Sequence, residues 1–452
     1  MRLRKTITTI VATAILLAGW QLFAVIANQP ELIPSLPRLV RTLCEWLVSG
    51  SFYQSVGATI LRGILGMSIS FVCAIGMAGL FARFEWVYEL FRPLLAIMRS
   101  IPVISFILLA LIFLNPESIP LMIAFLTMFP LLTENLTRGI LDLRPGLSIM
   151  ARQFHIKRSN VLFQIIYPQL KPFLYSGLAS AAGFGWRAII MGEVLSQCAF
   201  GIGSEMKRAQ NFIAVPELLA WTIVAGFISF FFDKGISKVA DITPKISFAN
   251  EDQTIPTPTL SVLDTKDISY QYGIQHFSHS FQKGIIYGIS APSGKGKTTL
   301  LNLIGGILLP TEGEIHPTRH FGIATIFQQP QLLPHLTAEE NIILPLSSFL
   351  TEEKARRIAQ KHLQEMEMEP FGNRYPKELS YGQQQRIAIA RALAYPSPLL
   401  LMDEPFKGLD EALSHRIIER IREKQMKEER IILFTSHNPD EIRLLADEVI
   451  YL

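Results

Sequence analysis

The feature that most constrains this fold is a series of long apolar stretches within the first 240 residues. A helix needs about 20 apolar residues to cross a bilayer core of about 30 Å. The stretches that meet or approach this length are 7–27, 56–82, 100–114, 119–136, 173–195 and 218–239. The stretch 100–114 is the shortest of them. The sequence therefore predicts six membrane spans.

The first stretch follows the basic start Met-Arg-Leu-Arg-Lys and resembles a signal peptide at first sight. Its apolar run is longer than the hydrophobic region of a signal peptide, and no cleavage site of the Ala-x-Ala kind closes it. We interpret it as the first span.

Basic residues indicate the orientation of the spans. If the amino terminus lies inside, the inner loops carry most of the arginines and lysines, and the outer loops carry only Arg38, Arg41, Lys207 and Arg208. Cytoplasmic loops of membrane proteins are enriched in these residues. The rule therefore agrees with six spans and places everything after residue 240 in the cytoplasm.

Charge divides the chain into two halves. Residues 1–240 hold 20 basic and 11 acidic side chains, whereas residues 241–452 hold 22 and 27. A sparse, basic half before a dense, mildly acidic one predicts a membrane domain at 1–240, a proline- and threonine-rich linker at 241–259 and a soluble α/β domain at 260–452. The net charge of +4 gives no reason to expect a nucleic-acid partner.

The inner loop between the fourth and fifth predicted spans, about 144–168, is basic and ends at Pro168. It resembles the permeases of binding-protein-dependent ABC importers, which carry a Glu-Ala-Ala-x3-Gly loop with a proline 13 residues after the glycine. Ile149-Met150-Ala151 stand at the Glu-Ala-Ala positions and His155 at the glycine. The resemblance implies a short coupling helix that docks on an ATPase. We expect His155 to keep a negative φ, because a side chain is disfavoured elsewhere.

The segment 177–203 is similar to the sulfonate, taurine, nitrate and thiamine-precursor branch of these permeases, which leaves those solute classes open. Arg187 and Glu193 lie in the fifth predicted span, where charge is costly and usually functional. Six residues apart, they face different sides of a helix. Our hypothesis is that Arg187 faces the translocation path or a partner helix; the alternative is a structural or snorkelling charge.

A predicted strand at 285–290 leads into a glycine-rich loop and an apolar helix. The loop reads Ala291-Pro292-Ser293-Gly294-Lys295-Gly296-Lys297-Thr298-Thr299. This is the phosphate-loop pattern, in which backbone N–H groups cradle phosphates, the lysine adds a point charge and the next hydroxyl reaches Mg²⁺. Ala291 replaces the first glycine, and it fits if that position does not need a positive φ.

The apolar run 399–402 ends in Asp403 and Glu404. A buried strand delivers carboxylates in this way to a site at its C-terminal end. We expect Asp403 to hold Mg²⁺ and Glu404 to orient and polarise the attacking water. The alternative is a core strand that ends in a solvated turn.

The segment Leu379-Ser380-Tyr381-Gly382-Gln383 resembles the ABC signature Leu-Ser-Gly-Gly-Gln. In ABC ATPases this segment begins a helix, and the resemblance implies that Ser380, Tyr381, Gly382 and Gln383 serve the γ-phosphate of a nucleotide bound by the other subunit. Tyr381 stands where the first glycine is expected.

Four further residues match family positions. Gln328 matches the Q-loop residue that senses Mg²⁺ and touches the coupling helix, Asp410 the D-loop, His437 the switch histidine, and Tyr272 the aromatic that stacks on adenine. The ordered motifs identify residues 260–452 as similar to ABC ATPases, which implies ATP and Mg²⁺ as ligands. The end at Leu452 leads us to expect no regulatory tail.

The predicted fold is a six-span helical membrane bundle of the type I importer kind, followed by an α/β P-loop ATPase with a helical subdomain. The resemblance implies a homodimer in the cytoplasmic membrane, with ATPase domains in the cytoplasm and an extracytoplasmic solute-binding protein as partner. Two alternatives stay open: an exporter half-transporter and an ATPase-inactive regulatory protein. The predicted spans exclude an ATPase that works away from membranes.

Overall fold

The computed structural model describes residues 2–240, 244–253, 260–271, 273–292, 294–317 and 322–452. The chain divides into two compact units, one comprising residues 1–143 and 169–243 and the other residues 144–168 and 244–452. The basic loop 144–168 therefore belongs with the second unit, although the helices on either side of it along the chain belong with the first.

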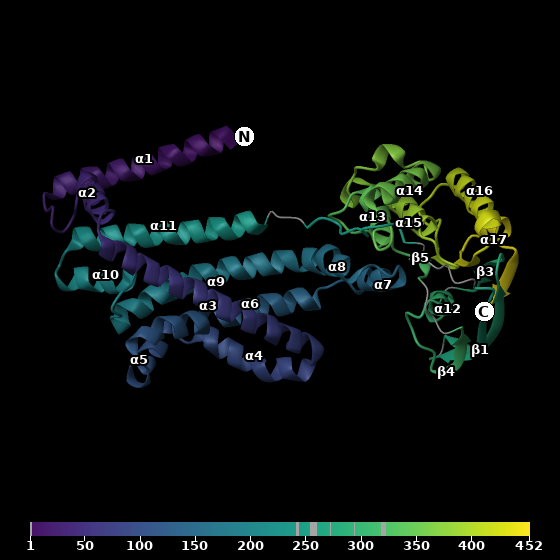
Figure 1. The fold of residues 1–452 in the computed structure, drawn as a ribbon, viewed down its shortest axis with the longest axis horizontal. Helices are drawn as coiled ribbons and strands as arrows, with labels where there is room; N and C mark the ends of the chain where they lie inside the picture. The colour runs from purple at the N-terminus through teal and green to yellow at the C-terminus, as the bar shows by residue number, and fades with distance from the viewer. Residues whose placement is uncertain (1, 241–243, 254–259, 272, 293, 318–321) are drawn as a thin grey trace. The chain divides into compact units, whose positions relative to one another are not determined.

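The first unit is helical (Figure 1). Its helices are α1 (Arg2–Ala27), α2 (Leu36–Trp46), α3 (Gly50–Arg83), α4 (Glu85–Ser100), α5 (Val103–Phe113), η1 (Pro116–Ser118), α6 (Ile119–Leu141), α9 (Tyr167–Ser196), α10 (Ile202–Asn211) and α11 (Val215–Ala240). Helix α3 packs along α6. Small residues allow this close approach, since a Cβ atom at Gly66 would lie 2.6 Å from Ala124 Cβ.

Four helical segments of the described chain are long and apolar enough to cross a membrane: 50–83, 116–141, 158–196 and 215–239. A fifth span results if α4 and α5, bent by 95° at their junction, are counted together. Helix α1 covers the first predicted span, and its apolar part Val11–Ala27 is shorter than the other four segments.

The predicted span at 100–114 is wrong as a single crossing helix. Ile101 is extended and Pro102 has ψ 131°, outside the helical region, because a residue before proline is driven out of that region and proline lacks a backbone donor. Helix α5 then has only 11 residues. At about 1.5 Å per residue it is far shorter than the bilayer core.

The second unit begins with α7 (Pro145–Gln153), α8 (Arg158–Asn160) and the π-helical turn η2 (Val161–Ile166). Its strands are β1 (Val262–Tyr270), β2 (Ile274–Gln282), β3 (Ile286–Ser290), β4 (Glu312–His316), β5 (Ala324–Ile326), β6 (Leu399–Asp403), β7 (Ile431–Thr435) and β8 (Glu448–Tyr451). Its other helices are α12 (Lys297–Ile304), α13 (Ala338–Leu346), α14 (Glu352–Glu365), η3 (Glu369–Phe371), η4 (Pro376–Glu378), α15 (Tyr381–Ala394), α16 (Glu411–Glu428) and α17 (Pro439–Leu445).

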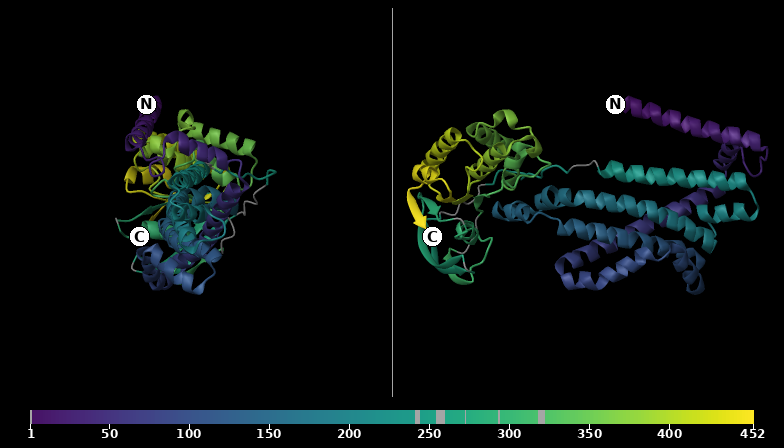
Figure 2. Two further views of the ribbon diagram at one scale, coloured as in Figure 1. Left: turned by 90° about the vertical axis from the view of Figure 1, so that its left-hand side faces the viewer. Right: turned by 180° about the vertical axis from the view of Figure 1, so that it is seen from behind.

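Two sheets organise this unit. The antiparallel sheet has the order β2-β1-β4, and the parallel sheet has the order β5-β6-β7-β3-β8. Within the unit, helices α13–α15 lie at one end and β1 and β4 at the other, with β3 and β5 between them (Figures 1 and 2). The α/β domain with a helical subdomain is therefore confirmed.

The parallel sheet brings three strand ends together. Strands β6 and β7 are buried along their whole length, as expected for strands covered on both faces. Thr435, the last residue of β7, pairs with Asp403 on β6 and with Ile289 on β3. The residues that follow these three strands therefore meet at one edge of the sheet.

Candidate nucleotide site

The loop between β3 and α12 has the conformation that its glycines permit. Gly294 and Gly296 have φ values of 81° and 87°. A Cβ atom at Gly296 would lie 2.7 Å from Gly273 O, so this position excludes any other residue. Ala291 does not have a left-handed backbone and carries no such strain.

Lys297 begins α12 and is buried. Its Nζ donates to Ala291 O at 2.7 Å and lies 3.4 Å from Pro292 O. The ammonium group thus lies inside its own loop, at a helix N-terminus where backbone N–H groups also point outward. This combination is suited to bind phosphate oxygens.

Asp403 is buried at the end of β6 and accepts two hydroxyl hydrogen bonds. Thr298 Oγ1 donates to Asp403 Oδ2 at 2.9 Å, and Thr435 Oγ1 donates to Asp403 Oδ1 at 2.8 Å. A carboxylate beside a hydroxyl is a hard oxygen pair of the kind that Mg²⁺ prefers. No cluster of three or more His, Cys, Asp or Glu in the described part of the chain is arranged for a metal. The Thr298 hydroxyl and the Asp403 carboxylate fit an ion that takes its other ligands from phosphates and water.

The three predicted metal-site residues line one cavity. Thr298, Gln328 and Asp403 face a space of about 260 Å³, and Gly146 and Ile149 of α7 are among the other residues that line it. Bound Mg²⁺ would neutralise phosphate charge there.

Glu404 follows β6 with a left-handed backbone, φ 48°. His437 Nε2 lies 2.8 Å from Glu404 Oε1, and Lys407 Nζ lies 3.4 Å from Oε2. Burial raises the pKa of Glu404, but hydrogen bonds from Gln328 and Lys407 and the charges of Lys407 and His437 outweigh it and hold the pKa below its ordinary value. The carboxylate is therefore ionised near neutral pH, as a group that accepts a proton from water must be.

The signature segment starts α15. Ser380 is its N-cap and forms a capping box with Gln383: Gln383 N donates to Ser380 Oγ at 3.3 Å, and Ser380 N donates to Gln383 Oε1 at 2.9 Å. Gly382 lies so close to Gly408 that a Cβ atom would be 2.5 Å from Gly408 O. Asp410 caps α16 by accepting from Leu413 N at 2.9 Å.

The structure gives few contacts for the remaining residues of the predicted nucleotide site. Tyr272 and Ser293 lie outside the described residues. Pro292 and Lys295 are exposed on the loop, and Thr299 lies in the first turn of α12.

The expectation of a negative φ at His155 is wrong, because its φ is 46°. His155 follows α7, where His155 N donates to Arg152 O and Ile156 N donates to Ala151 O. These two bonds are the Schellman pattern, which ends a helix with a left-handed residue. The buried Ala151 and Ile156 supply its apolar contact, so that satisfied carbonyls and packing offset the cost of about 1–2 kcal/mol for the side chain.

Helix α7 is joined to the rest of its unit by residues that the motifs did not reveal. Gln153 Nε2 donates to Gly305 O at 2.7 Å, and Ile323 N donates to Gln153 O at 2.9 Å. Gly146 lies against the Gln331 side chain, where a Cβ atom would be 2.6 Å from Oε1. The α7 segment thus contacts the Gln331 side chain, and Gly146 and Ile149 line the same cavity as Gln328.

The buried charge of the first unit also has a partner that sequence reasoning missed. Glu193 is wholly buried and accepts from Arg62 Nη1 at 2.7 Å, from Thr59 and from Gly203 N. Arg62 also reaches Glu117 at 2.7 Å. Arg187, on α9 with Glu193, is exposed. Arg62 lies inside the predicted span 56–82, and this position was the sequence signal that could have indicated a buried partner for Glu193.

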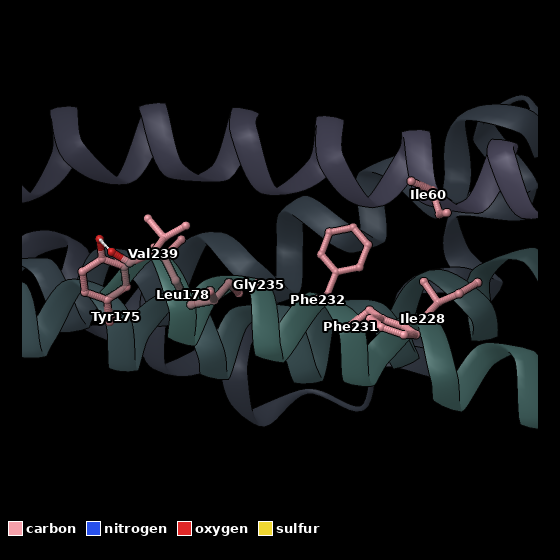
Figure 3. A pocket seen from close by; sticks show the side chains of 9 residues that line it. Ile60, Tyr175, Leu178, Ile228, Phe231, Phe232, Gly235 and Val239 are labelled. Atoms are coloured by element: carbon pink, nitrogen blue, oxygen red, sulfur yellow. Dashed lines mark hydrogen bonds between the residues drawn. The ribbon is translucent and has the colours of Figure 1, made fainter. Parts of the chain in front are cut away.

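The first unit holds a cavity of about 600 Å³ between α3, α9 and α11. Figure 3 shows Tyr175 and Val239 at one end and Ile60 and Ile228 at the other. The Tyr175 hydroxyl donates a hydrogen bond to Val239 O at 3.2 Å. None of the described residues that line the cavity is charged. This apolar cavity offers nothing that would hold an anion.

Comparison with known proteins identifies both units. Residues 274–407 match the family described as ABC transporter, and residues 56–233 match the family described as binding-protein-dependent transport system inner membrane component. The thiamine import ATP-binding protein ThiQ of Yersinia pseudotuberculosis is 34% identical, over 42% of this chain and 86% of its own length. An uncharacterized ABC transporter ATP-binding protein of Methanocaldococcus jannaschii, MJ0796, is 34% identical over 40% of this chain and 85% of its own length.

The Fe(3+) ions import ATP-binding protein FbpC of Rhizobium etli is 35% identical over 40% of this chain. The chain spans about half the length of this and similar curated relatives, 54% in the case of FbpC. Among solved structures, the dimeric MJ0796 cassette bound to ADP and Pi is 32% identical, with a TM-score of 0.40, over 42% of this chain and 94% of that one.

The chain belongs to the ABC transporter family. It joins a membrane-embedded, multi-pass permease unit of the binding-protein-dependent kind to an ABC ATPase unit in one polypeptide.

Proposed function

We propose that this chain hydrolyses ATP with Mg²⁺ to import a small solute across the cytoplasmic membrane. One observation carries the proposal: β3 leads to Lys297 and Thr298, β6 ends in Asp403 and is followed by Glu404, only β7 separates these two strands, and Thr298 is hydrogen-bonded to Asp403 at the edge of the sheet. A phosphate-binding lysine, a metal-binding carboxylate and an ionised water-polarising carboxylate are the groups that phosphoryl transfer to water requires.

The proposed working unit is two copies of this chain. Each copy has one phosphate loop and one signature segment, and the family resemblance implies that a nucleotide lies between the loop of one copy and the signature of the other. The permease match supports an extracytoplasmic solute-binding protein as a further partner. The solute class stays open between sulfonates, oxyanions and thiamine precursors, and the apolar cavity in Figure 3 does not supply a site for an anion.

The test is phosphate release by the purified full chain in liposomes, with ATP and Mg²⁺. We expect steady turnover that Glu404→Gln lowers by about a hundredfold or more, because the water loses its proton acceptor. The matched control is Glu423→Gln, an exposed glutamate on α16. Equal rates in the wild type and Glu404→Gln would overturn the proposed activity and favour the regulatory alternative.

Direction and stoichiometry need separate experiments. Native mass measurement of Glu404→Gln with ATP is expected to give two copies of the chain. Uptake into vesicles that depends on an external binding protein supports import, whereas ATP-driven efflux without such a protein favours the exporter alternative.

A further inference from the structure

Tyr381 connects the signature segment to the Q-loop of its own chain. Its hydroxyl donates to Gln328 O at 2.7 Å. Its ring lies against Gly408, where a Cβ atom would be 2.8 Å from Tyr381 Cδ1. The glycine found at this signature position in the family has no side chain that reaches either partner. This tether is therefore a property of the tyrosine.

The residue held by this tether contacts the proposed water-polarising carboxylate. The Gln328 side chain lies close enough to Glu404 to lower the pKa of that carboxyl. Lys407, one residue before Gly408, lies 3.4 Å from Glu404 Oε2, and His437 lies 2.8 Å from Oε1. Groups of the same chain thus lie beside both carboxylate oxygens. A carboxylate whose lone pairs are engaged in this way accepts a proton from water less readily.

Lys407 and Tyr381 are partly exposed to solvent, so their side chains can move away from Glu404 and Gln328. The Lys407 side chain is 50% exposed and Tyr381 is 41% exposed, whereas the Glu404 side chain is only 15% exposed. A partly exposed lysine changes partners at little cost. Glu404 is held in place at the end of β6, whereas the side chains of Lys407 and Tyr381 on its solvent side can move.

We propose that Tyr381 and Lys407 form a resting clamp on Glu404. Tyr381 is a positioning residue that fixes Gln328 through its carbonyl, and Lys407 neutralises the carboxylate until ATP closes the site. This inference rests on the ATPase activity proposed above and deepens it: the clamp keeps basal hydrolysis slow in the absence of transported solute.

The test compares basal ATP turnover of the full chain in liposomes, without solute or binding protein. Lys407→Met is expected to raise kcat by about two- to fivefold, the effect of releasing a partly exposed ion pair. Tyr381→Phe keeps the ring and removes the hydroxyl, and it is expected to raise kcat in the same direction. Lys407 lies outside the phosphate loop and the signature segment, so KM for ATP is expected to stay unchanged in Lys407→Met.

Two conservative variants separate the clamp from a general structural role. Lys407→Arg keeps the charge and is expected to retain the slow basal rate. Tyr53→Phe removes a bond of the same type, from the Tyr53 hydroxyl to Leu47 O at 2.9 Å in the first unit, and is expected to leave ATP turnover unchanged.

The outcomes distinguish this inference from the proposed function. If the wild type turns over ATP faster than Glu404→Gln, but Lys407→Met and Tyr381→Phe match or fall below the wild-type rate, the clamp is overturned and the ATPase stands. If the wild type and Glu404→Gln are equally slow, the ATPase proposal fails, and the clamp fails with it.

Discussion

The Phe154 ring lies against the guanidinium group of Arg391, whose Cζ is 5.4 Å from the ring centroid. Arg391 is wholly buried on α15, the helix that begins with the signature segment, and burial lowers its pKa to about 10. It also donates to Pro330 O at 2.9 Å and Gln331 O at 2.8 Å. One side chain thus joins the loop 144–168, the segment after β5 and the signature helix.

Phe154→Ala is expected to destabilise the second unit by about 3–5 kcal/mol, because it removes a fully buried ring that also packs edge-on against Tyr395. Thermal unfolding in detergent measures the change. The matched control is Phe163→Ala in the same loop, where the side chain is 48% exposed and the cost is expected to be far smaller. Equal shifts for the two variants would contradict the central position of Phe154.

Arg62→Met is expected to destabilise the permease unit by about 3–5 kcal/mol, because it leaves Glu193 as a buried charge without its ion-pair partner. Adding Glu193→Gln to Arg62→Met is expected to recover part of that loss. Thermal stability by size-exclusion chromatography after heating compares the variants. Arg187→Gln, at an exposed position, is expected to stay within about 0.5 kcal/mol of the wild type.

Arg187→Gln also addresses the hypothesis that Arg187 faces the translocation path or a partner helix. Lost uptake with normal stability supports that hypothesis, whereas normal uptake discards it.

Asp403→Asn is expected to raise the Mg²⁺ concentration needed for half-maximal ATPase activity by about ten- to a hundredfold. The asparagine amide lacks the negative charge that holds a hydrated ion, although its oxygen can still accept a hydrogen bond from the Thr298 hydroxyl. Titration of activity with Mg²⁺ after chelator treatment measures this. Asp267→Asn, an exposed position with φ 52° that asparagine tolerates, is the control. An unchanged Mg²⁺ requirement in Asp403→Asn would exclude this residue from the metal site.

The acid limb of the ATPase rate is expected to shift in Lys407→Met. The pKa of Glu404 lies below the ordinary 4.5 in the wild type, so its carboxylate stays ionised as the pH falls toward that value. Removing the Lys407 charge removes one group that lowers this pKa, so the pKa rises and protonation begins at higher pH. Rate profiles from about pH 4 to about pH 8 compare the variants. An acid limb in Lys407→Met at the same pH as in the wild type would contradict the contact between Lys407 and Glu404.

Gly296→Ala is expected to abolish nucleotide binding, because φ is 87° and the added Cβ would strike Gly273 O. Ala291→Gly is expected to change ATP turnover by less than about twofold, since Ala291 does not need the freedom of glycine. Binding of a fluorescent ATP analogue and phosphate release measure the two effects. A large gain in Ala291→Gly would show that the alanine impairs the loop.

The local conformation of the short motifs was predictable from those runs of sequence alone. The phosphate loop, the pair Asp403-Glu404 and the signature segment each keep their functional groups within a few residues, because each forms at a strand end or a helix start. Hydropathy likewise revealed four of the long apolar helices, since the length of a span is fixed by the bilayer. It failed at 100–114, where Pro102 ends one helix and α5 is too short to cross.

Tertiary structure alone decided which distant groups meet. Arg62 and Glu193, Tyr381 and Gln328, and Gln153 and Gly305 are paired by how helices and strands pack, and neither spacing nor periodicity carries that information. The left-handed His155 shows the same limit at one residue: the sequence gives the cost of a positive φ, but the helix cap and apolar contact that offset this cost exist only in the folded unit.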